Sequence, residues 1–426
     1  MTDGLQTEAA PRTRGSWPAT ARRHARAFPT QFWLLIGGTF VYFVGYDLCY
    51  PFESVYLHTH LGISTTTVGL IMGLSLFAGL PAQIIGGAVA DRLGRRAVLI
   101  LGICVSMALF EGLAFAHQLW QVILPIAVEA GFGWAMYLTA TNAMLADFSS
   151  PQVRSEAYSI SRVATNAGMV VGPLTGGALL AAGLSYRSLF ISGGAICGLF
   201  LLIVVFRLVE TKPAAAHPST ATPSTFGGYR VVLRDRRFLA FCAVTLLPLY
   251  AFGQFFVTLP VVLRSSPGTS VSAWGVLAAI YAGCGVLLQY PTMRRTKGRE
   301  RMHVMAAICV VMGVGMAGAA YAPAGVPIAA CVFFYSIGAT LFTPITAAIV
   351  AGMAPVELRG RYMGAWTALW LAGLALGPTF GGLAVDRLGR HGAYAIIFAV
   401  CLAGAALYAL LSRLARPVRG QTSGSS

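Results

Sequence analysis

The sequence predicts an all-α membrane protein of twelve transmembrane helices, arranged as two six-helix bundles. Hydrophobic residues make up 57% of the 426-residue chain, charged residues only 10%, and the mean hydropathy is +0.72. A soluble domain carries about 25% charged residues, so most of this surface must face lipid. Lipid offers no partner for an open backbone group, so each span must be a helix of roughly 20 residues.

Twelve apolar segments of this length follow one another along the chain. We expect spans at 32–57, 66–90, 97–116, 119–146, 156–181, 187–208, 238–263, 272–291, 304–321, 326–352, 361–383 and 391–411. Domain boundaries follow from these spans: a disordered cytoplasmic tail at 1–30, an N-terminal bundle at 31–208, a cytoplasmic linker with an amphipathic helix at 209–237, a C-terminal bundle at 238–411 and a second tail at 412–426. The first segment is polar and lacks the pattern of a secretory signal peptide.

The net charge of +16 is a topology signal. Of the 30 Lys and Arg residues, 25 fall in the tails and in the loops of one side. The positive-inside rule then puts both termini in the cytoplasm of a multi-pass protein of the cell inner (plasma) membrane. Anionic membrane lipid is an expected partner of these charges and nucleic acid is not. The eight cysteines are scattered over the spans without metal-ligand or redox spacing, so we expect neither a metal nor a cofactor.

The two bundles repeat one design. At a constant offset of 205, Gly168, Gly172, Pro173, Gly176 and Gly177 match Gly373, Gly377, Pro378, Gly381 and Gly382. The fifth and eleventh spans are therefore equivalent. A parallel six-plus-six repeat predicts a substrate site near the midplane between the halves.

The loop after the second span carries a dense charge cluster. Its residues are Gly87, Asp91, Arg92, Gly94, Arg95 and Arg96. The run resembles motif A of the major facilitator superfamily, which implies a gating brace against the start of the eleventh span, near 359–362. The alternative is a basic loop that only fixes topology. At an offset of 204 the second half carries a weaker copy of this run, with Arg295 in place of Asp91. A more similar sequence, residues 381–390, falls on the outer side and has no functional explanation.

Gly168, Gly172, Pro173, Gly176 and Gly177 resemble motif C, which is typical of proton-coupled exporters. Glycines four residues apart let helices approach closely, and proline bends a helix. The alternative is a generic small-residue packing face, because the eleventh span repeats the pattern.

Ionisable groups inside the membrane are functional candidates by default. Asp47, Glu129 and Asp147 are the expected proton or coupling sites, together with Arg162, two turns into the fifth span. Protonation of an acid paired with Arg162 would release an ion-pair lock, whereas a permanent Asp47–Arg162 pair would be structural. We expect Glu53 and Glu111 at the exposed rim.

Aromatic and polar side chains in the spans predict an apolar pocket for bulky amphipathic or cationic small molecules. The candidates are Tyr46, Tyr50, Trp134, Tyr137, Asn142, Tyr250, Gln254, Tyr281, Tyr335 and Trp366. Lipid-facing positions would explain about half of such residues.

Within the superfamily the chain resembles bacterial twelve-span drug/proton antiporters, especially multidrug exporters of the lactococcal type. Asp147 follows Thr141-Asn142 at the end of span four, where such exporters carry a carboxylate. The chain departs from the pattern at Ala127, where motif B has an arginine, and at Ala339, where some exporters have an acid.

The resemblance implies a monomeric, proton-coupled secondary exporter working by alternating access. A proton-coupled uptake symporter for a sugar, peptide or other metabolite is the alternative, and a membrane receptor or scaffold is a more distant one. No nucleophile–base or metal constellation suggests an enzyme.

Overall fold

The computed structural model describes residues 28–211, 230–264, 268–355 and 358–415. The side chains of residues 78, 80–91 and 271 are not part of this description. Most of the expected tails and most of the expected linker lie outside the described residues. Residues 230–232, from the expected amphipathic helix, are helical and are followed by a turn.

The N-terminal half consists of six long helical segments. They are α2 (Thr30–Thr59), α3 (Thr65–Leu93), α4 (Arg95–Ala114), a composite span, α7 (Arg154–Ala181) and α8 (Tyr186–Phe206). The composite span joins α5 (Leu119–Val128) and α6 (Trp134–Asp147) through η1 (Glu129–Gly133), a π-helical turn.

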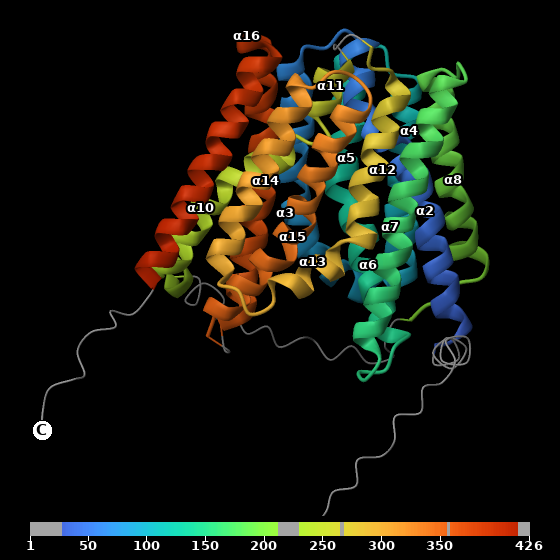
Figure 1. Cartoon of the computed structure of the whole chain (residues 1–426). Coiled ribbons are helices and arrows are strands. Elements are labelled where there is room, and N and C mark those ends of the chain that lie inside the picture. Colours follow the sequence, from blue (N-terminus) through green and yellow to red (C-terminus); the bar gives the residue numbers. More distant parts are fainter. Residues whose placement is uncertain (1–27, 212–229, 265–267, 356–357, 416–426) are drawn as a thin grey trace, which may run out of the picture.

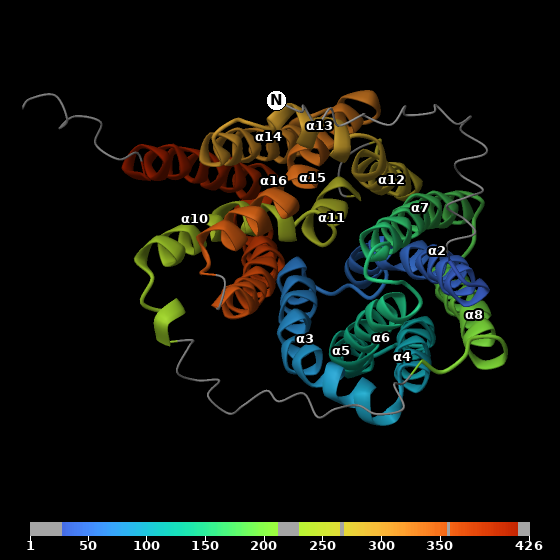
Figure 2. The same cartoon turned by 90° about the horizontal axis from the view of Figure 1, so that it is seen from below.

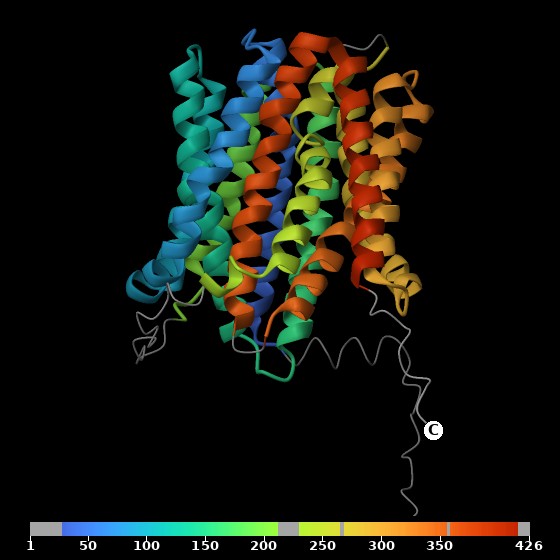
Figure 3. The same ribbon diagram turned by 90° about the vertical axis from the view of Figure 1, so that its left-hand side faces the viewer.

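The C-terminal half repeats this order with two broken spans. Its helices are α10 (Arg236–Gly253), α11 (Thr258–Arg264), α12 (Val271–Leu287), α13 (Gln289–Thr296), α14 (Arg301–Tyr321), α15 (Val326–Met353) and α16 (Arg359–Ala415). The label α16 covers two helices, because the chain folds back at Gly389, where φ is 67°. Figure 3 shows the two arms of α16 joined at the top of the view, with α10 between them.

The predicted fold class is confirmed. In the described part of the chain, nine helices are long and apolar enough to cross a membrane, and the pair α12 and α13, bent by 53°, makes a tenth. The remaining two of the twelve expected segments correspond to α3, which is apolar over its described portion Thr65–Phe77, and to the second arm of α16.

The helices run side by side between two ends of the bundle (Figure 1). We call the end that carries Arg92, Arg95, Arg96 and Arg154 the basic end, and the end that carries the Gly389 turn the opposite end. Seen from below, α2 to α8 and α10 to α16 form two groups (Figure 2). The halves meet where α3 packs on α16 and α7 packs on α12.

Candidate functional site

The candidate site begins with a carboxylate buried in the N-terminal half. Glu129 is 6% exposed and lies at the first residue of η1. Its Oε1 accepts hydrogen bonds from the Tyr46 hydroxyl at 3.3 Å and the Ser106 hydroxyl at 3.4 Å. Ser106 in turn lies 2.9 Å from the Tyr42 hydroxyl. The acid is therefore surrounded by hydroxyl groups that can follow a change in its protonation.

The π-helical turn makes room for this carboxylate. A Cβ atom at Gly133 would lie 3.0 Å from Cγ and 3.1 Å from Oε1 of Glu129. Single π-helical turns inside α-helices occur often at functional sites. The sequence places Glu129 in a span, but nothing in its letters identifies the π-turn, and Ser106 was not among the expected site residues.

Aromatic rings form the wall next to Glu129. Tyr42, Tyr46 and Tyr50 form a ladder along α2, with centroids 5.7 and 5.6 Å apart, as their spacing suggests. Tyr137 stacks on Tyr42 at 4.0 Å, and Trp134 lies 5.7 Å from Tyr46. The structure thus brings together four of the expected pocket residues, Tyr46, Tyr50, Trp134 and Tyr137.

Two further acids are buried on α2. Asp47 is 5% exposed and Glu53 is 2% exposed. Asp47 Oδ2 and Glu53 Oε1 are buried and have no hydrogen-bond partner among the described residues. The expectation of a rim position for Glu53 is wrong, because α2 continues to Thr59 and α11 packs against it. Glu111, by contrast, is exposed.

A second aromatic cluster lies in the C-terminal half. Phe255 stacks on Tyr335 at 4.9 Å and lies 4.7 Å from Tyr281. Phe256 lies 5.3 Å from Tyr281 and 6.0 Å from Tyr50 of the other half. The Tyr50–Phe256 contact joins the two clusters across the interface. Phe255 and Phe256 were not among the expected pocket residues.

The other expected pocket residues do not join this contact. Asn142 is exposed, and its backbone carbonyl accepts a hydrogen bond from Tyr158 at 3.0 Å. Gln254 is buried and accepts a hydrogen bond from Thr258 at 3.2 Å. Trp366 lies 5.7 Å from Trp370, in a separate aromatic group of the C-terminal half. Tyr250 contributes its backbone carbonyl to the packing of α10 on α16.

Arg162 does not pair with Asp47. Its side chain is exposed and forms no ion pair with a carboxylate in the described part of the chain. It lies close enough to Tyr281 of α12 to interact with it electrostatically. The expected Asp47–Arg162 pair is therefore not formed in this conformation.

The charged loop anchors the basic end of the N-terminal half. Arg95 forms an ion pair with Asp147 at the end of α6, and its Nη1 donates to the Ala143 carbonyl at 3.4 Å. Arg96 Nε donates to the Val204 carbonyl of α8 at 3.0 Å. Two arginines of motif A thus hold the ends of α6 and α8. Asp147 belongs to this anchor and not to the surroundings of Glu129.

A carboxylate that the sequence reading missed caps this loop. Glu210 accepts hydrogen bonds from the backbone N–H groups of Arg95 at 2.9 Å and Arg96 at 3.1 Å. These groups open α4, where a negative charge is favoured. Gly94 precedes them with φ at 96°, a conformation that glycine adopts readily. Gly87 and Asp91 belong to α3, but their side chains lie outside the described part.

The motif C residues form a close helix contact. Gly168, Gly172, Pro173, Gly176 and Gly177 are all buried in α7. A Cβ at Gly172 would lie 2.8 Å from the Val44 carbonyl and 2.9 Å from the Asp47 carbonyl carbon. In the equivalent place on α16, a Cβ at Gly377 would lie 2.5 Å from the Tyr250 carbonyl. Gly172 and its repeat Gly377 therefore pack against the first span of their own half.

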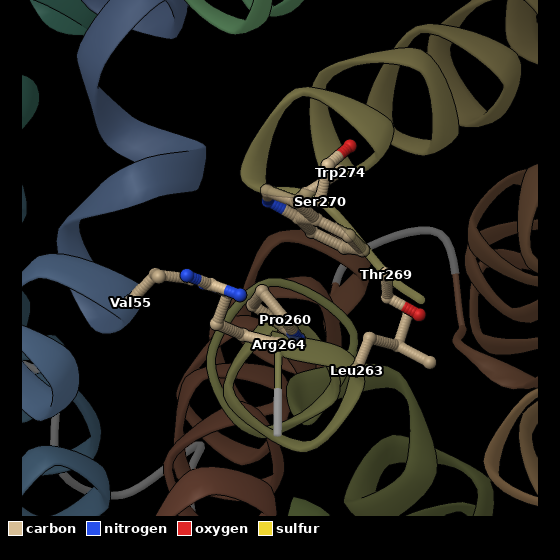
Figure 4. A pocket seen from close by; sticks show the side chains of 7 residues that line it. All are labelled: Val55, Pro260, Leu263, Arg264, Thr269, Ser270 and Trp274. Carbon is tan, nitrogen blue, oxygen red and sulfur yellow. The ribbon is translucent and has the colours of Figure 1, made fainter. Parts of the chain in front are cut away.

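Hydrogen bonds seal the halves together toward the opposite end. Trp274 Nε1 donates to the Pro51 carbonyl at 2.6 Å, and Ser54 Oγ donates to the Phe256 carbonyl at 3.4 Å. Beside them lies a cavity of about 10 Å³, in which the Arg264 side chain extends toward Val55 (Figure 4). A space of this size holds about one water molecule. The path between the halves is therefore closed here.

The Asp386 carboxylate also bridges the halves at this end. Its Oδ2 accepts hydrogen bonds from the Thr66 backbone N–H at 2.7 Å and the Thr66 hydroxyl at 2.6 Å. The hydrogen bonds of Pro51, Ser54 and Thr66 all lie in the parts of α2 and α3 nearest the opposite end. The structure is thus a conformation closed at that end.

Comparisons with known proteins agree with this architecture. Residues 35–332 and 255–426 match the family model described as Major Facilitator Superfamily. The multidrug resistance protein MdtH of Cronobacter sakazakii is 30% identical over 362 residues, covering 84% of this chain and 86% of the relative. The uncharacterised MFS-type transporter YttB of Bacillus subtilis is 26% identical over 409 residues, covering 93% and 100%.

Solved structures share the fold at low identity. The nucleoside transporter NupG superposes with a TM-score of 0.75 at 14% identity, covering 91% of this chain and 100% of its own. A bacterial homologue of the human lysosomal transporter Spinster, in an inward-facing conformation, superposes with a TM-score of 0.70 at 16% identity, covering 94% and 98%.

Proposed function

The chain belongs to the Major Facilitator Superfamily, and we propose that within it the protein is a proton-coupled exporter of drug-like, amphipathic small molecules. Membership makes it a membrane-embedded transporter and not an enzyme. The observation that carries the proposal is the buried carboxyl group of Glu129, hydrogen-bonded to Tyr46 and walled by aromatic rings.

The environment of Glu129 supports proton coupling. A charged carboxylate at the centre of a membrane helix costs at least about 2.5 kcal/mol. Two hydroxyl groups offset only part of this cost, so the neutral acid is the stable form when the site is shut off from water. Asp47, buried on the neighbouring helix, adds a second proton site on the same reasoning. A proton taken up here favours the conformations in which these acids are buried.

The aromatic contact between the halves supports the substrate class. Tyr46 and Tyr50 on one side and Phe256 and Tyr281 on the other offer broad apolar faces with few polar groups. Such surfaces bind bulky rings without demanding one hydrogen-bond pattern. A positive charge on the substrate would be attracted both by the ring faces and by an ionised Glu129. Proton release and substrate binding would then compete for this carboxylate.

We further propose that the basic end faces the cytoplasm in the inner membrane, in line with the positive-inside rule. The structure, which is closed at the opposite end, is then closed toward the outside. In this state the motif A cations hold α6 and α8 of their own half. Tyr362, at the start of the eleventh span, donates a hydrogen bond to Asp235 of its own half at 2.8 Å. The brace between 91 and 359–362 would form in the outward-facing state. Asp147 contributes to the state closed toward the outside through its ion pair with Arg95. Arg162 remains available to pair with a carboxylate transiently in another state.

Inside-out membrane vesicles test the direction and the driving force. An acidified lumen should drive accumulation of a fluorescent amphipathic cation, and the accumulation should collapse when the gradient is dissipated. The control is the same vesicle preparation without the protein. Accumulation in right-side-out vesicles with an outside-acid gradient would instead identify a proton-coupled uptake symporter.

A further inference from the structure

Two ten-residue segments of the chain share seven letters. They are residues 86–95, Gly-Gly-Ala-Val-Ala-Asp-Arg-Leu-Gly-Arg, and residues 381–390, Gly-Gly-Leu-Ala-Val-Asp-Arg-Leu-Gly-Arg. The internal repeat does not relate them, because their offset is 295 while the halves repeat at 204 to 205. The first segment is motif A at the basic end. The second lies at the opposite end, where the proposed transport cycle gives it no role.

The helices that precede the two segments form an antiparallel pair. Gly382 of α16 lies against the Thr65 carbonyl at the start of α3, and Gly73, further along α3, lies against the Ala375 carbonyl. Residue numbers therefore rise along one helix as they fall along the other, and Figure 2 shows the two helices as neighbours. The second segment therefore ends its helix beside the beginning of α3, whereas the first segment ends α3 toward the end of the molecule at which α16 begins.

The residues that the two segments share form the same local turn. Gly94 and Gly389 both adopt positive φ, 96° and 67°, and each is followed by the next helix. The acid stands three residues before this glycine in both segments. Asp91 and Asp386 thus occupy corresponding positions at the two ends of the antiparallel pair.

Asp386 shows what this position does when it is engaged. Its carboxylate accepts both the backbone N–H and the hydroxyl of Thr66, in the first turn of α3. A negative charge at a helix N-terminus is favourable. Burial by itself would raise the pKa of Asp386, but the hydrogen bonds from Thr66 and Thr65 and the nearby His58 outweigh it and lower the pKa. The carboxylate is therefore charged and joins the C-terminal half to the N-terminal half.

We infer that Asp386, carried by the segment 381–390, forms with Thr66 a second gating latch, which holds the opposite end closed as motif A holds the basic end in the other state. Both latches sit on one helix pair, α3 and α16. Rocking of the pair about its glycine contacts, such as Gly73, separates Asp386 from Thr66 while it brings the other ends together. One helix pair thus couples the two gates in opposite senses. The inference needs neither proton coupling nor a direction of transport.

Spin-label distances across the opposite end test the latch. Labels are placed at Leu119→Cys of α5 and Val326→Cys of α15, both exposed, in a background with Cys104 and Cys331 replaced by serine. Removal of the carboxylate in Asp386→Ala should raise the ratio of long to short distances roughly fivefold or more, the factor that corresponds to about 1 kcal/mol. A ratio unchanged from the parent protein would overturn the inference.

Two further variants control the result. Arg387→Ala removes the neighbouring exposed charge of the same segment and should leave the distance ratio within about twofold of the parent. Thr66→Val keeps the backbone N–H and should have a smaller effect than Asp386→Ala. In the double variant Asp386→Ala/Thr66→Val, the Thr66→Val change should not alter the distance ratio further, because the carboxylate that binds Thr66 is already absent. Additive effects, or an Arg387→Ala effect as large as that of Asp386→Ala, would contradict a latch at this pair.

Discussion

Gly275 of α12 lies directly against the backbone carbonyl of Pro173 of α7, across the interface between the halves. The equivalent contact on the other side of the molecule joins Gly69 of α3 to the carbonyl of Pro378 of α16. In both places a Cβ atom would collide with backbone, which cannot give way as a flexible side chain can. Pro173 of motif C and its repeat Pro378 therefore each pack against a glycine of the other half. These two close contacts hold the halves together toward the opposite end.

Substitution of this glycine should open that end. Gly275→Ala places a methyl group on the Pro173 carbonyl, and overpacking of this kind costs about 1 to 3 kcal/mol. The closed conformation should lose population, seen as longer spin-label distances across the opposite end and slower transport. Gly283→Ala on the same helix is the matched control, because a Cβ there meets nothing within 4 Å. Equal behaviour of the two variants would show that the contact does not limit closure.

The acid of motif A should matter more than the corresponding residue of the second half. Asp91→Asn removes the charge expected to brace the basic end, whereas the repeat has Arg295 there and no acid. We expect Asp91→Asn to reduce initial transport rates at least tenfold, a barrier change of about 1.4 kcal/mol, and Arg295→Ala to leave them nearly unchanged. Comparable losses in both variants would mean that the loop acts only through its basic charge.

Glu53 should resist ionisation because the seal at the opposite end surrounds it. Its neighbours on α2, Pro51 and Ser54, both make hydrogen bonds to the other half. Glu53→Gln keeps the shape without the charge, so it should increase the population of the conformation closed at the opposite end. Glu111→Gln changes an exposed acid and should have no effect on the same distance measurement. A shift toward the open conformation in Glu53→Gln would rule out this role.

The latch at Asp386 should be insensitive to pH in the physiological range. Hydrogen bonds from Thr66 outweigh burial and lower the pKa of Asp386 below the usual 3.8. A lowered pKa means that the stabilisation is fully present above the usual value and is lost only as the pH falls through the lowered one. The effect of Asp386→Ala on the distance ratio should therefore be the same at pH 8 and pH 5. An effect that vanishes by pH 6 would contradict the assignment of the latch to a charged Asp386.

Features that depend on one helix follow directly from the spacing of residues in the sequence. The ladder of Tyr42, Tyr46 and Tyr50 and the close packing of Gly172 both follow from residues four apart on a single span. The twelve apolar segments follow from the requirement that each span bury its own backbone groups.

Features that depend on contacts between distant segments were missed or misjudged. Glu53 is near the end of a span in the sequence, yet it is buried on a helix against which α11 packs. Glu210 and Asp386 find their partners 115 and 320 residues away, and no spacing rule connects them. No sequence pattern marks the π-helical turn at Glu129, because glycines such as Gly133 are common in membrane helices.

The most direct measurement of the proposed mechanism compares Glu129→Gln with Glu111→Gln in the inside-out vesicles. Both changes remove one carboxylate from the N-terminal half, but only Glu129 is buried among the aromatic rings. We predict that an inside-acid gradient drives dye accumulation with the parent protein and with Glu111→Gln. Glu129→Gln should still bind the dye in the absence of a gradient, with no accumulation above the protein-free control. Gradient-driven accumulation by Glu129→Gln at the parental rate would contradict the assignment of this carboxylate to proton coupling.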